Sequence, residues 1–434
     1  MPMPPYPVIV VPGITAVYLH DQYALPPDVV WSVTTREYGR AALHPDNLRY
    51  EAIEPSRIVL GQIFEVAYRE LIEELRHNLR LKEDLPVPVF PFSYDWRQPI
   101  ETSEQQLALF IDEAIARTSL LRHYAKEGYG DAPKVNLVGH SMGGLVIAGY
   151  LESAGNNHRV HKVATLATPF QGSFESLTKI TTGTASLGES ASSSREREAA
   201  RLTPALYQLL PSFEGGVVPD PGLPTSLFDP GVWQPSIINS IKEFIRLHGL
   251  GKAANRDQQA RALFNGLLAA GASHRGRMDT LDLGAVGLRP DDWLCVVGVD
   301  SKTRVRLKVV KPGPEFSFLD DDEQNEWRDP DPRVRRLTGD GTVPFEGAVP
   351  KFLSEENLVC VTPEDFGTWE VQDRVISSVA GFHGILPNMD MLHRMMVAHF
   401  TGRPGRYGNI WGRLPPGVDK EKWRPPIADL RDKR

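Results

Sequence analysis

Residues 135–144 read Val-Asn-Leu-Val-Gly-His-Ser-Met-Gly-Gly, and this is the most informative stretch of the chain. The residues before Gly139 are mostly apolar and rich in valine, which is typical of a buried β-strand. After the glycines, residues 145–151 continue as an apolar segment of helical character. The stretch therefore predicts a strand and a helix joined by a sharp turn, with Ser141 at the tip of that turn.

The spacing of Gly139, Ser141 and Gly143 matches the nucleophile elbow of α/β-hydrolases. In such an elbow the serine has a strained backbone, and its hydroxyl stands clear of the sheet. Glycines are expected on both sides because a Cβ there would collide with a neighbouring strand or helix. The helix that follows also presents free N–H groups where a negatively charged oxygen could form. We interpret Ser141 as a nucleophile; the competing interpretation is an ordinary glycine-rich turn.

The composition narrows the class of protein. The chain has 434 residues, a net charge of −7 and two cysteines. Its length permits two or three domains, or one large domain with an insertion. The mild negative charge argues against a nucleic-acid-binding protein. Cys295 and Cys360 lie in apolar, strand-like runs, so we expect buried free thiols in preference to a disulfide or a nucleophile.

No segment approaches the ~20 apolar residues that a membrane-spanning helix needs. The first residues, Met-Pro-Met-Pro-Pro-Tyr-Pro, have neither the basic region nor the apolar core of a signal peptide. The sequence thus predicts a protein that is cytoplasmic or exported without a signal peptide. The acidic run at 320–323 is interpreted as a solvated loop, and neither a metal nor another cofactor is expected.

Alternating strand and helix patterns predict an α/β fold, with a mostly parallel twisted sheet flanked by helices. The expected strands are 7–11, 87–92, 135–139, 161–169, 292–299 and 357–361, with a hairpin over 304–311 and helices over 58–81, 103–127 and 389–400. Prolines in the 87–92 run make it a poor central strand.

The alternation breaks at Phe170. Between 170 and 290 apolar residues recur at helical spacing, for example in 203–211 and 237–245. We therefore predict a helical cap or lid over 170–290, inserted into a core formed by 1–169 and 291–434. Residues 15–56 are irregular and rich in proline, and we regard them as a candidate additional lid loop.

A serine hydroxyl needs a base to remove its proton and a carboxylate to orient that base. In α/β-hydrolases these groups follow in the order serine, acid, histidine. Here that order gives Ser141, Asp340 and His383. Asp340 lies between two glycines in a tight loop, and His383 lies in a glycine-flanked loop after the last expected strand.

Other side chains compete for these roles. Asp300, directly after the 292–299 strand, is the main alternative acid. His393 and His399 are alternative bases, but they fall inside the expected helix 389–400. His140 is adjacent to Ser141, yet the elbow geometry directs it elsewhere, so we expect it to pack or hydrogen-bond beside the site.

The first strand ends abruptly at Pro12-Gly13. In this fold the loop after such a strand supplies one oxyanion N–H, and the residue after the nucleophile supplies the other. We therefore assign the two donors to the backbone amides of Ile14 and Met142. The alternative is that Pro12-Gly13 is merely a turn.

Four motifs, in this order, resemble the lecithin:cholesterol acyltransferase-like family. They are Tyr94-Asp95-Trp96-Arg97, Gly139-His140-Ser141-Met142-Gly143, Gly339-Asp340-Gly341-Thr342-Val343-Pro344 and His383-Gly384-Ile385-Leu386. The resemblance extends from Val8 to about Leu392, and the 203–211 segment is similar to a cap segment of that group.

This resemblance implies an α/β-hydrolase fold and the activity of a lipase, phospholipase or acyltransferase. It also implies Ser141 as nucleophile with Asp340 and His383 as its partners, and Ile14 and Met142 as oxyanion donors. Asp95 and Arg97 are interpreted as an ion pair that supports the site, in preference to substrate contacts.

The function expected from the sequence is hydrolysis of carboxylic esters of lipids through an acyl-enzyme on Ser141. Secreted members of the family have a signal peptide and a disulfide-stapled lid, which we do not recognise in this sequence. An intracellular or specially exported bacterial-type lipid esterase is therefore favoured. Alternatives are a lipid acyltransferase with the same triad, a leaderless exported phospholipase toxin, and a non-catalytic lipid-binding protein. The expected partner is an apolar ester, met during transient contact with a membrane surface.

Overall fold

Six parallel strands form the central sheet, in the spatial order β16-β11-β9-β8-β1-β7. Their bounds are Val8–Val11 (β1), Val89–Pro91 (β7), Val135–His140 (β8), Val160–Leu166 (β9), Trp293–Gly298 (β11) and Leu358–Val361 (β16). Every neighbouring pair is parallel. Strands β1, β8 and β11 are buried along their whole length, as expected when helices cover both faces of a sheet. The predicted α/β-hydrolase architecture is confirmed.

This computed structural model describes residues 4–183, 194–310, 315–317, 323–367, 370, 381–404 and 409–432. Residues 184–193 of the predicted cap and residues 320–322 of the acidic run lie outside the described parts. Within the described parts, no helix combines the length and the apolar character that crossing a membrane requires.

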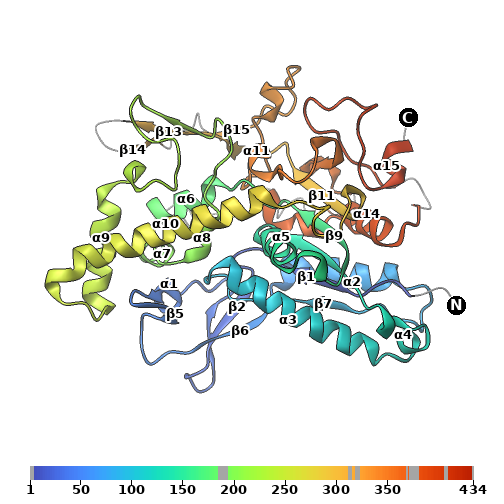
Figure 1. Cartoon of the computed structure of the whole chain (residues 1–434), viewed down its shortest axis with the longest axis horizontal. Coiled ribbons are helices and arrows are strands. Elements are labelled where there is room, and N and C mark those ends of the chain that lie inside the picture. Colours follow the sequence, from blue (N-terminus) through green and yellow to red (C-terminus); the bar gives the residue numbers. More distant parts are fainter. Residues whose placement is uncertain are drawn as a thin grey trace.

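Two pairs of helices pack on the sheet (Figure 1). Helix α3 (Ile100–Ser119) contacts α5 (Met142–Ala154), and α2 (Glu65–Leu79) contacts α14 (Asp390–Thr401). In α2 the residues at helical spacing are the buried ones: Tyr68, Leu71, Ile72, Leu75 and Leu79. This apolar stripe is what joins the helix to the core.

Two predicted helices have different bounds. Residues Ile58–Ile63 form strand β6 and not the first turns of a helix, because they pair with β2 (Val17–Asp21). Long-range pairing here outweighs the local helical spacing. The helix predicted over 103–127 divides into α3 and α4 (Arg122–Lys126).

The segment 15–56 contains regular structure where only an irregular loop was expected. Strand β3 (Asp28–Trp31) joins β2 and β6 in a three-stranded sheet, and β4 (Leu43–His44) pairs with β5 (Asn47–Glu51) after helix α1 (Tyr38–Ala41). Whether this segment acts as a lid stays a prediction.

The insertion between β9 and β11 is largely helical. It contains α6 (Phe174–Thr181), α7 (Ser194–Ala200), α8 (Pro204–Gln208), α9 (Pro235–His248) and α10 (Arg256–Thr280). Apolar residues of α9 and α10, such as Ile241 and Phe264, bury themselves in a second hydrophobic cluster distinct from the one around the sheet. In Figure 1 the long helix α10 extends from α9 towards α5, and α10 contacts α5. The assignment of 170–290 as a cap stays a prediction.

The remaining elements are short. The insertion's β10 (Val217–Pro219) pairs with β13 (Leu307–Val310), and β13 pairs with β14 (Glu315–Ser317). The hairpin predicted within 304–311 is therefore wrong in its bounds, because the partner strand of β13 begins only at Glu315. Strand β12 (Thr303–Arg304) pairs with β15 (Glu323–Gln324), and the C-terminal half adds α11 (Phe345–Ala348), α13 (Phe382–Ile385) and α15 (Ala428–Asp432). Cys295 and Cys360 are buried free thiols, as predicted.

Candidate active site

Ser141 occupies a sharp turn between β8 and α5. Its backbone angles are φ 53° and ψ −129°, a region that L-residues rarely adopt. A Cβ on Gly139 would lie 2.7 Å from the Cα of Gly144, and a Cβ on Gly143 would collide with the carbonyl oxygen of Val11. Both elbow positions therefore require glycine, and the strained turn lifts Ser141 above the end of the sheet.

The structure brings Ser141, His383 and Asp340 together from three distant parts of the chain. Nε2 of His383 lies 2.9 Å from Oγ of Ser141, and Nδ1 of His383 lies 2.6 Å from Oδ2 of Asp340. The other carboxylate oxygen of Asp340 accepts the N–H groups of Thr342 at 2.9 Å and Val343 at 2.7 Å. One oxygen of Asp340 is thus held by its own loop, and the other faces the imidazole.

The competing side chains lie elsewhere. Asp300 accepts hydrogen bonds from Asn325 and Arg328 at 3.0 and 3.3 Å. His393 and His399 are buried in α14, where each has its Nε2 beside a backbone carbonyl oxygen, of Pro387 and Val163 respectively. Among the described residues, Asp340 is the carboxylate that contacts the His383 ring.

The loop after β1 lies against the elbow. A Cβ on Gly13 would be 2.9 Å from the Cβ of Ser141, so this loop approaches the serine closely. Met142 is the first residue of α5. In the described part of the chain, the N–H groups of Ile14 and Met142 have no hydrogen-bond acceptor. Both amides are therefore available to a ligand oxygen near Ser141.

His140 lies beside this site in a fully enclosed position. Its Nδ1 is 2.7 Å from the hydroxyl of Tyr68, and its Nε2 is 3.0 Å from the carbonyl oxygen of His383. Burial, and then the nearby charge of His383, hold the pKa of His140 well below its ordinary value. Tyr68 was not predicted, because in the sequence it is only one apolar position on the face of a helix.

Asp95 and Arg97 form the predicted ion pair, with Nη2 of Arg97 2.8 Å from Asp95. The same guanidinium contacts Glu51 at 3.0 Å and donates to the carbonyl oxygen of Ala41 at 3.2 Å. Burial opposes the positive charge, but the two carboxylates outweigh it and raise the pKa of Arg97. Arg97 therefore ties the β4–β5 segment to the loop after β7. No local sequence pattern indicated Glu51 as a partner of Arg97, because the two residues are 46 positions apart.

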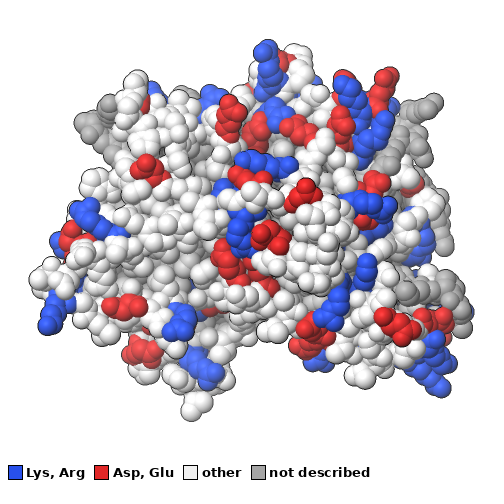
Figure 2. Space-filling view, viewed as in Figure 1, with Lys and Arg blue, Asp and Glu red and all other residues white. Residues whose placement is uncertain are grey.

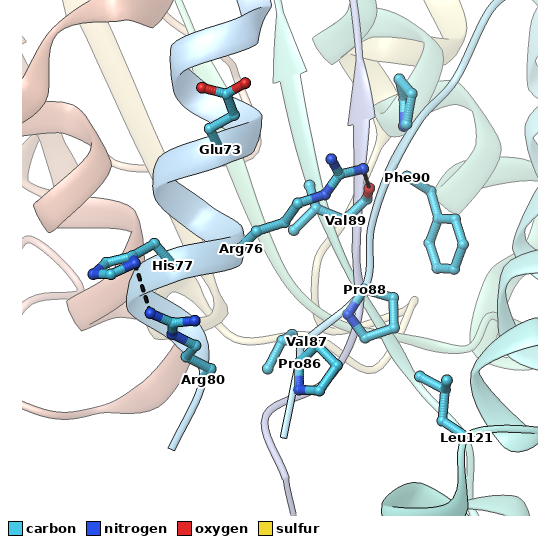
Figure 3. Close-up of a pocket in the computed structure, with 11 residues that line it drawn as sticks. Glu73, Arg76, His77, Arg80, Pro86, Val87, Pro88, Val89, Phe90 and Leu121 are labelled. Atoms are coloured by element: carbon cyan, nitrogen blue, oxygen red, sulfur yellow. Dashed lines mark hydrogen bonds between the residues drawn. The ribbon is translucent and has the colours of Figure 1, made fainter. Parts of the chain in front are cut away.

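An open groove of about 540 Å³ lies along the edge strand β7 (Figure 3). Val89 in this groove is level with Val8 and Asn136, near the start of the strands, whereas Ser141 follows the end of β8. Figure 3 shows the guanidinium of Arg76 pointing to the carbonyl oxygen of Val89, which it contacts at 2.9 Å. The groove is thus separate from the candidate active site.

A cluster of charged residues joins α10 to α3 and α5. Glu101, Glu104 and His274 lie close enough together to hold a metal ion. However, Arg277 contacts Glu104 at 2.9 Å and Glu152 at 2.8 Å, so a guanidinium already neutralises this group.

On the face drawn in Figure 2, positive and negative side chains are interspersed, with no broad area of one sign.

The parallel sheet, the strained serine between β8 and α5, and the late histidine loop together define the fold of an α/β-hydrolase. Residues 62–240 match the family model described as lecithin:cholesterol acyltransferase. This match includes the motifs at 94–97 and 139–143, and it confirms the resemblance recognised in the sequence. It supports an enzyme that transfers or hydrolyses acyl groups.

A solved structure agrees on the fold. A chain from the crystal structure of the Tle4-Tli4 complex has 17% sequence identity and a TM-score of 0.52, covering 80% of this chain and 89% of that chain. At that identity the likeness concerns the fold alone. The structure of a gene product from Listeria innocua has 15% identity, covers 57% of this chain and 80% of that chain, and has a TM-score of 0.20, too low to carry weight. No curated protein matches the sequence.

Proposed function

We propose that this chain is a serine hydrolase that cleaves carboxylic esters of lipids through an acyl-enzyme on Ser141. The observation that supports this most is the hydrogen-bonded series Asp340–His383–Ser141, with separations of 2.6 and 2.9 Å. Such a series is the minimum arrangement that makes a serine hydroxyl nucleophilic near neutral pH. The family match supplies the lipid character of the substrate.

The proposed reaction begins when Oγ of Ser141 attacks the ester carbonyl carbon and Nε2 of His383 takes the hydroxyl proton. Asp340 keeps the other ring nitrogen protonated and stabilises the imidazolium that forms. The developing oxyanion accepts hydrogen bonds from the N–H groups of Ile14 and Met142. Losing one such donor typically raises the activation free energy by about 3 kcal/mol. His383 then protonates the leaving alcohol, and a water molecule activated by His383 releases the acid.

Acyl transfer is the second candidate, because the matching family is described as an acyltransferase. The first half of the reaction is the same, and an acceptor alcohol replaces water in the second half.

We also propose that the chain acts in the cytoplasm or is exported without a signal peptide. Transient contact with a membrane surface is part of the same proposal. An exported phospholipase toxin and a lipid-binding protein without activity are weaker alternatives.

Covalent labelling tests the nucleophile. An alkyl fluorophosphonate should modify the wild-type protein at Ser141, located by peptide mass mapping, and should not modify Ser141→Ala. Failure of the folded wild-type protein to react would contradict the proposed function and favour the lipid-binding alternative. Turnover of esters of increasing acyl length, with and without an acceptor alcohol, then separates hydrolysis from transfer.

A further inference from the structure

A continuous series of hydrogen bonds connects the loop after β1 with the backbone of His383. Gly13 N–H lies 2.9 Å from the Tyr68 hydroxyl, which lies 2.7 Å from Nδ1 of His140. Nε2 of His140 lies 3.0 Å from the carbonyl oxygen of His383. Tyr68 and His140 are 1% and 4% exposed, so water does not compete for these bonds.

The direction of each bond follows from the chemistry of its ends. A carbonyl oxygen only accepts, so His140 carries its proton on Nε2 and donates it to His383. Its ring is neutral near pH 7 because burial lowers its pKa, and a protonated His383 would lower it further. Nδ1 is therefore an acceptor, and the Tyr68 hydroxyl donates to it while accepting the N–H of Gly13. All three links are satisfied in one arrangement of protons.

The two ends of this series belong to different parts of the candidate site. At one end, Gly13 directly precedes Ile14, and the carbonyl oxygen of Pro12 accepts the hydroxyl of Tyr94 at 2.7 Å. The carbonyl oxygen of Pro12 and the N–H of Gly13 belong to one peptide group, so this group, directly before Ile14, is held on both sides. At the other end, His383 donates its own N–H to the carbonyl oxygen of Asp340 at 3.1 Å. With the bond from His140, both backbone polar groups of His383 are held.

We propose that Tyr68 and His140 are positioning residues that keep the Ile14 amide and the His383 ring in a single geometry over Ser141. Neither side chain touches the reacting atoms. The role rests on the proposed function, since it requires Ile14 and His383 to act on a group bound at Ser141. The N–H of Gly13 bonds to Tyr68, and Ile14 is the next residue whose N–H has no acceptor among the described residues.

The test is the saturation kinetics of labelling by an alkyl fluorophosphonate. In this reaction Oγ of Ser141 bonds to phosphorus, the phosphorus–fluorine bond breaks, fluoride leaves, and His383 takes the serine proton. The maximal rate reports the geometry of the reacting groups, and the half-saturating concentration reports binding of the alkyl chain.

For Tyr68→Phe we expect the maximal rate to fall roughly 10–100-fold, with the half-saturating concentration within about twofold of wild type. The matched control is Tyr124→Phe, which removes the hydroxyl of another buried tyrosine that donates to the carbonyl oxygen of Pro5 at 2.6 Å. This control should label like the wild-type protein. His140→Gln should reproduce the effect of Tyr68→Phe, and it decides the question if Tyr68→Phe does not fold.

The double variant Tyr68→Phe/His140→Gln should be no slower than the slower single variant, because both changes break one series. If the rate losses multiply, or if the single variants label like Tyr124→Phe, the positioning role is wrong while the proposed function stands. A raised half-saturating concentration with an intact maximal rate would also overturn it, in favour of substrate contact. Absence of labelling in the wild-type protein would remove the proposed function and this role together.

Discussion

The positions around Ser141 show how strictly a close-packed turn limits residue choice. Gly143 lies against the carbonyl oxygen of Val11, which belongs to the central sheet and cannot move without disturbing it. Ser141 itself has a positive φ of 53°. Strain at one residue is therefore maintained by close packing at its neighbours.

Gly143→Ala should destabilise the protein by about 1–3 kcal/mol, because a methyl group must displace strand backbone. Urea unfolding monitored by circular dichroism measures this change. The matched control is Gly276→Ala in α10, where a Cβ would have open space within 4 Å. In an exposed helical position alanine should instead stabilise by about 0.5–1 kcal/mol. Equal effects of the two substitutions would contradict the packing argument.

Asp340→Asn tests the carboxylate that contacts His383. The amide preserves volume but not charge, so the imidazole loses its preferred tautomer, and kcat should fall by roughly 10³–10⁴-fold. Asp300→Asn is the comparison, because Asp300 was the rival in the sequence and contacts Asn325 and Arg328. Its kcat on the same ester should change by less than about threefold. If Asp300→Asn were the more damaging change, the assignment would have to be reversed.

At the level of secondary-structure elements, apolar periodicity correctly predicted the strands and helices whose structure depends on their own local sequence. The buried runs of β8 and β11 and the stripe of α9 could be recognised because each repeats at the period of its own structure. Residues 58–63 were assigned to a helix because their pairing with β2 involves a partner some 40 positions away. Tyr68 and Glu51 were missed for the same reason: their partners are distant in sequence, and no local pattern indicates them.

The end of β2 offers a pH-dependent contact between elements. Asp21 is buried there, and it accepts N–H groups of Tyr23 and Arg57 and the guanidinium of Arg40, in α1. Burial alone would raise the pKa of Asp21, but the N–H group of Arg57 and the guanidinium of Arg40 outweigh it and lower the pKa to about 2. Asp21 therefore stabilises the fold above its unfolded pKa near 4, and this contribution is lost as pH falls towards 2.

Asp21→Asn should lower the free energy of unfolding at pH 7 by about 1–2 kcal/mol. The deficit should shrink as pH falls from about 4 to 2, in urea titrations at several pH values. Asp28→Asn is the matched control, since Asp28 also contacts Arg40 but is largely exposed, and it should change stability by less than about 0.5 kcal/mol. A deficit that stayed constant with pH would show that the charge of Asp21 is not responsible.

At the scale of the whole molecule, His161 and His399 lie in surroundings that disfavour their charged form. Burial, and then the charge of Lys162, lower the pKa of His399 to about 3. Burial and then Lys162 likewise lower the pKa of His161 to about 4. The folded state thus keeps these rings neutral where the unfolded chain binds protons. Each of these histidines lowers the free energy of unfolding as pH falls below about 6.5, the pKa of histidine in the unfolded chain. This loss grows until the pH reaches the pKa of the same histidine in the folded state.

For His399 alone the cost reaches about 3 kcal/mol at pH 4. His399→Gln keeps a donor for the carbonyl oxygen of Val163 but cannot be protonated, so its unfolding free energy should fall less between pH 7 and pH 4 than that of the wild-type protein. His77→Gln, at an exposed position on α2, should follow the wild-type curve. Parallel curves for all three proteins would rule out His399 as a source of acid sensitivity.

The two edge strands of the central sheet, β7 and β16, have several of their outward backbone groups already occupied. On the outward side of β7, Pro91 has no N–H to donate, and Arg76 occupies the carbonyl oxygen of Val89. On β16, Cys360 exchanges two backbone hydrogen bonds with Arg413, and Trp423 donates to the carbonyl oxygen of Leu358. In the described part of the chain, neither edge strand presents a continuous row of free backbone groups for a second molecule to pair with, which disfavours fibrillar stacking.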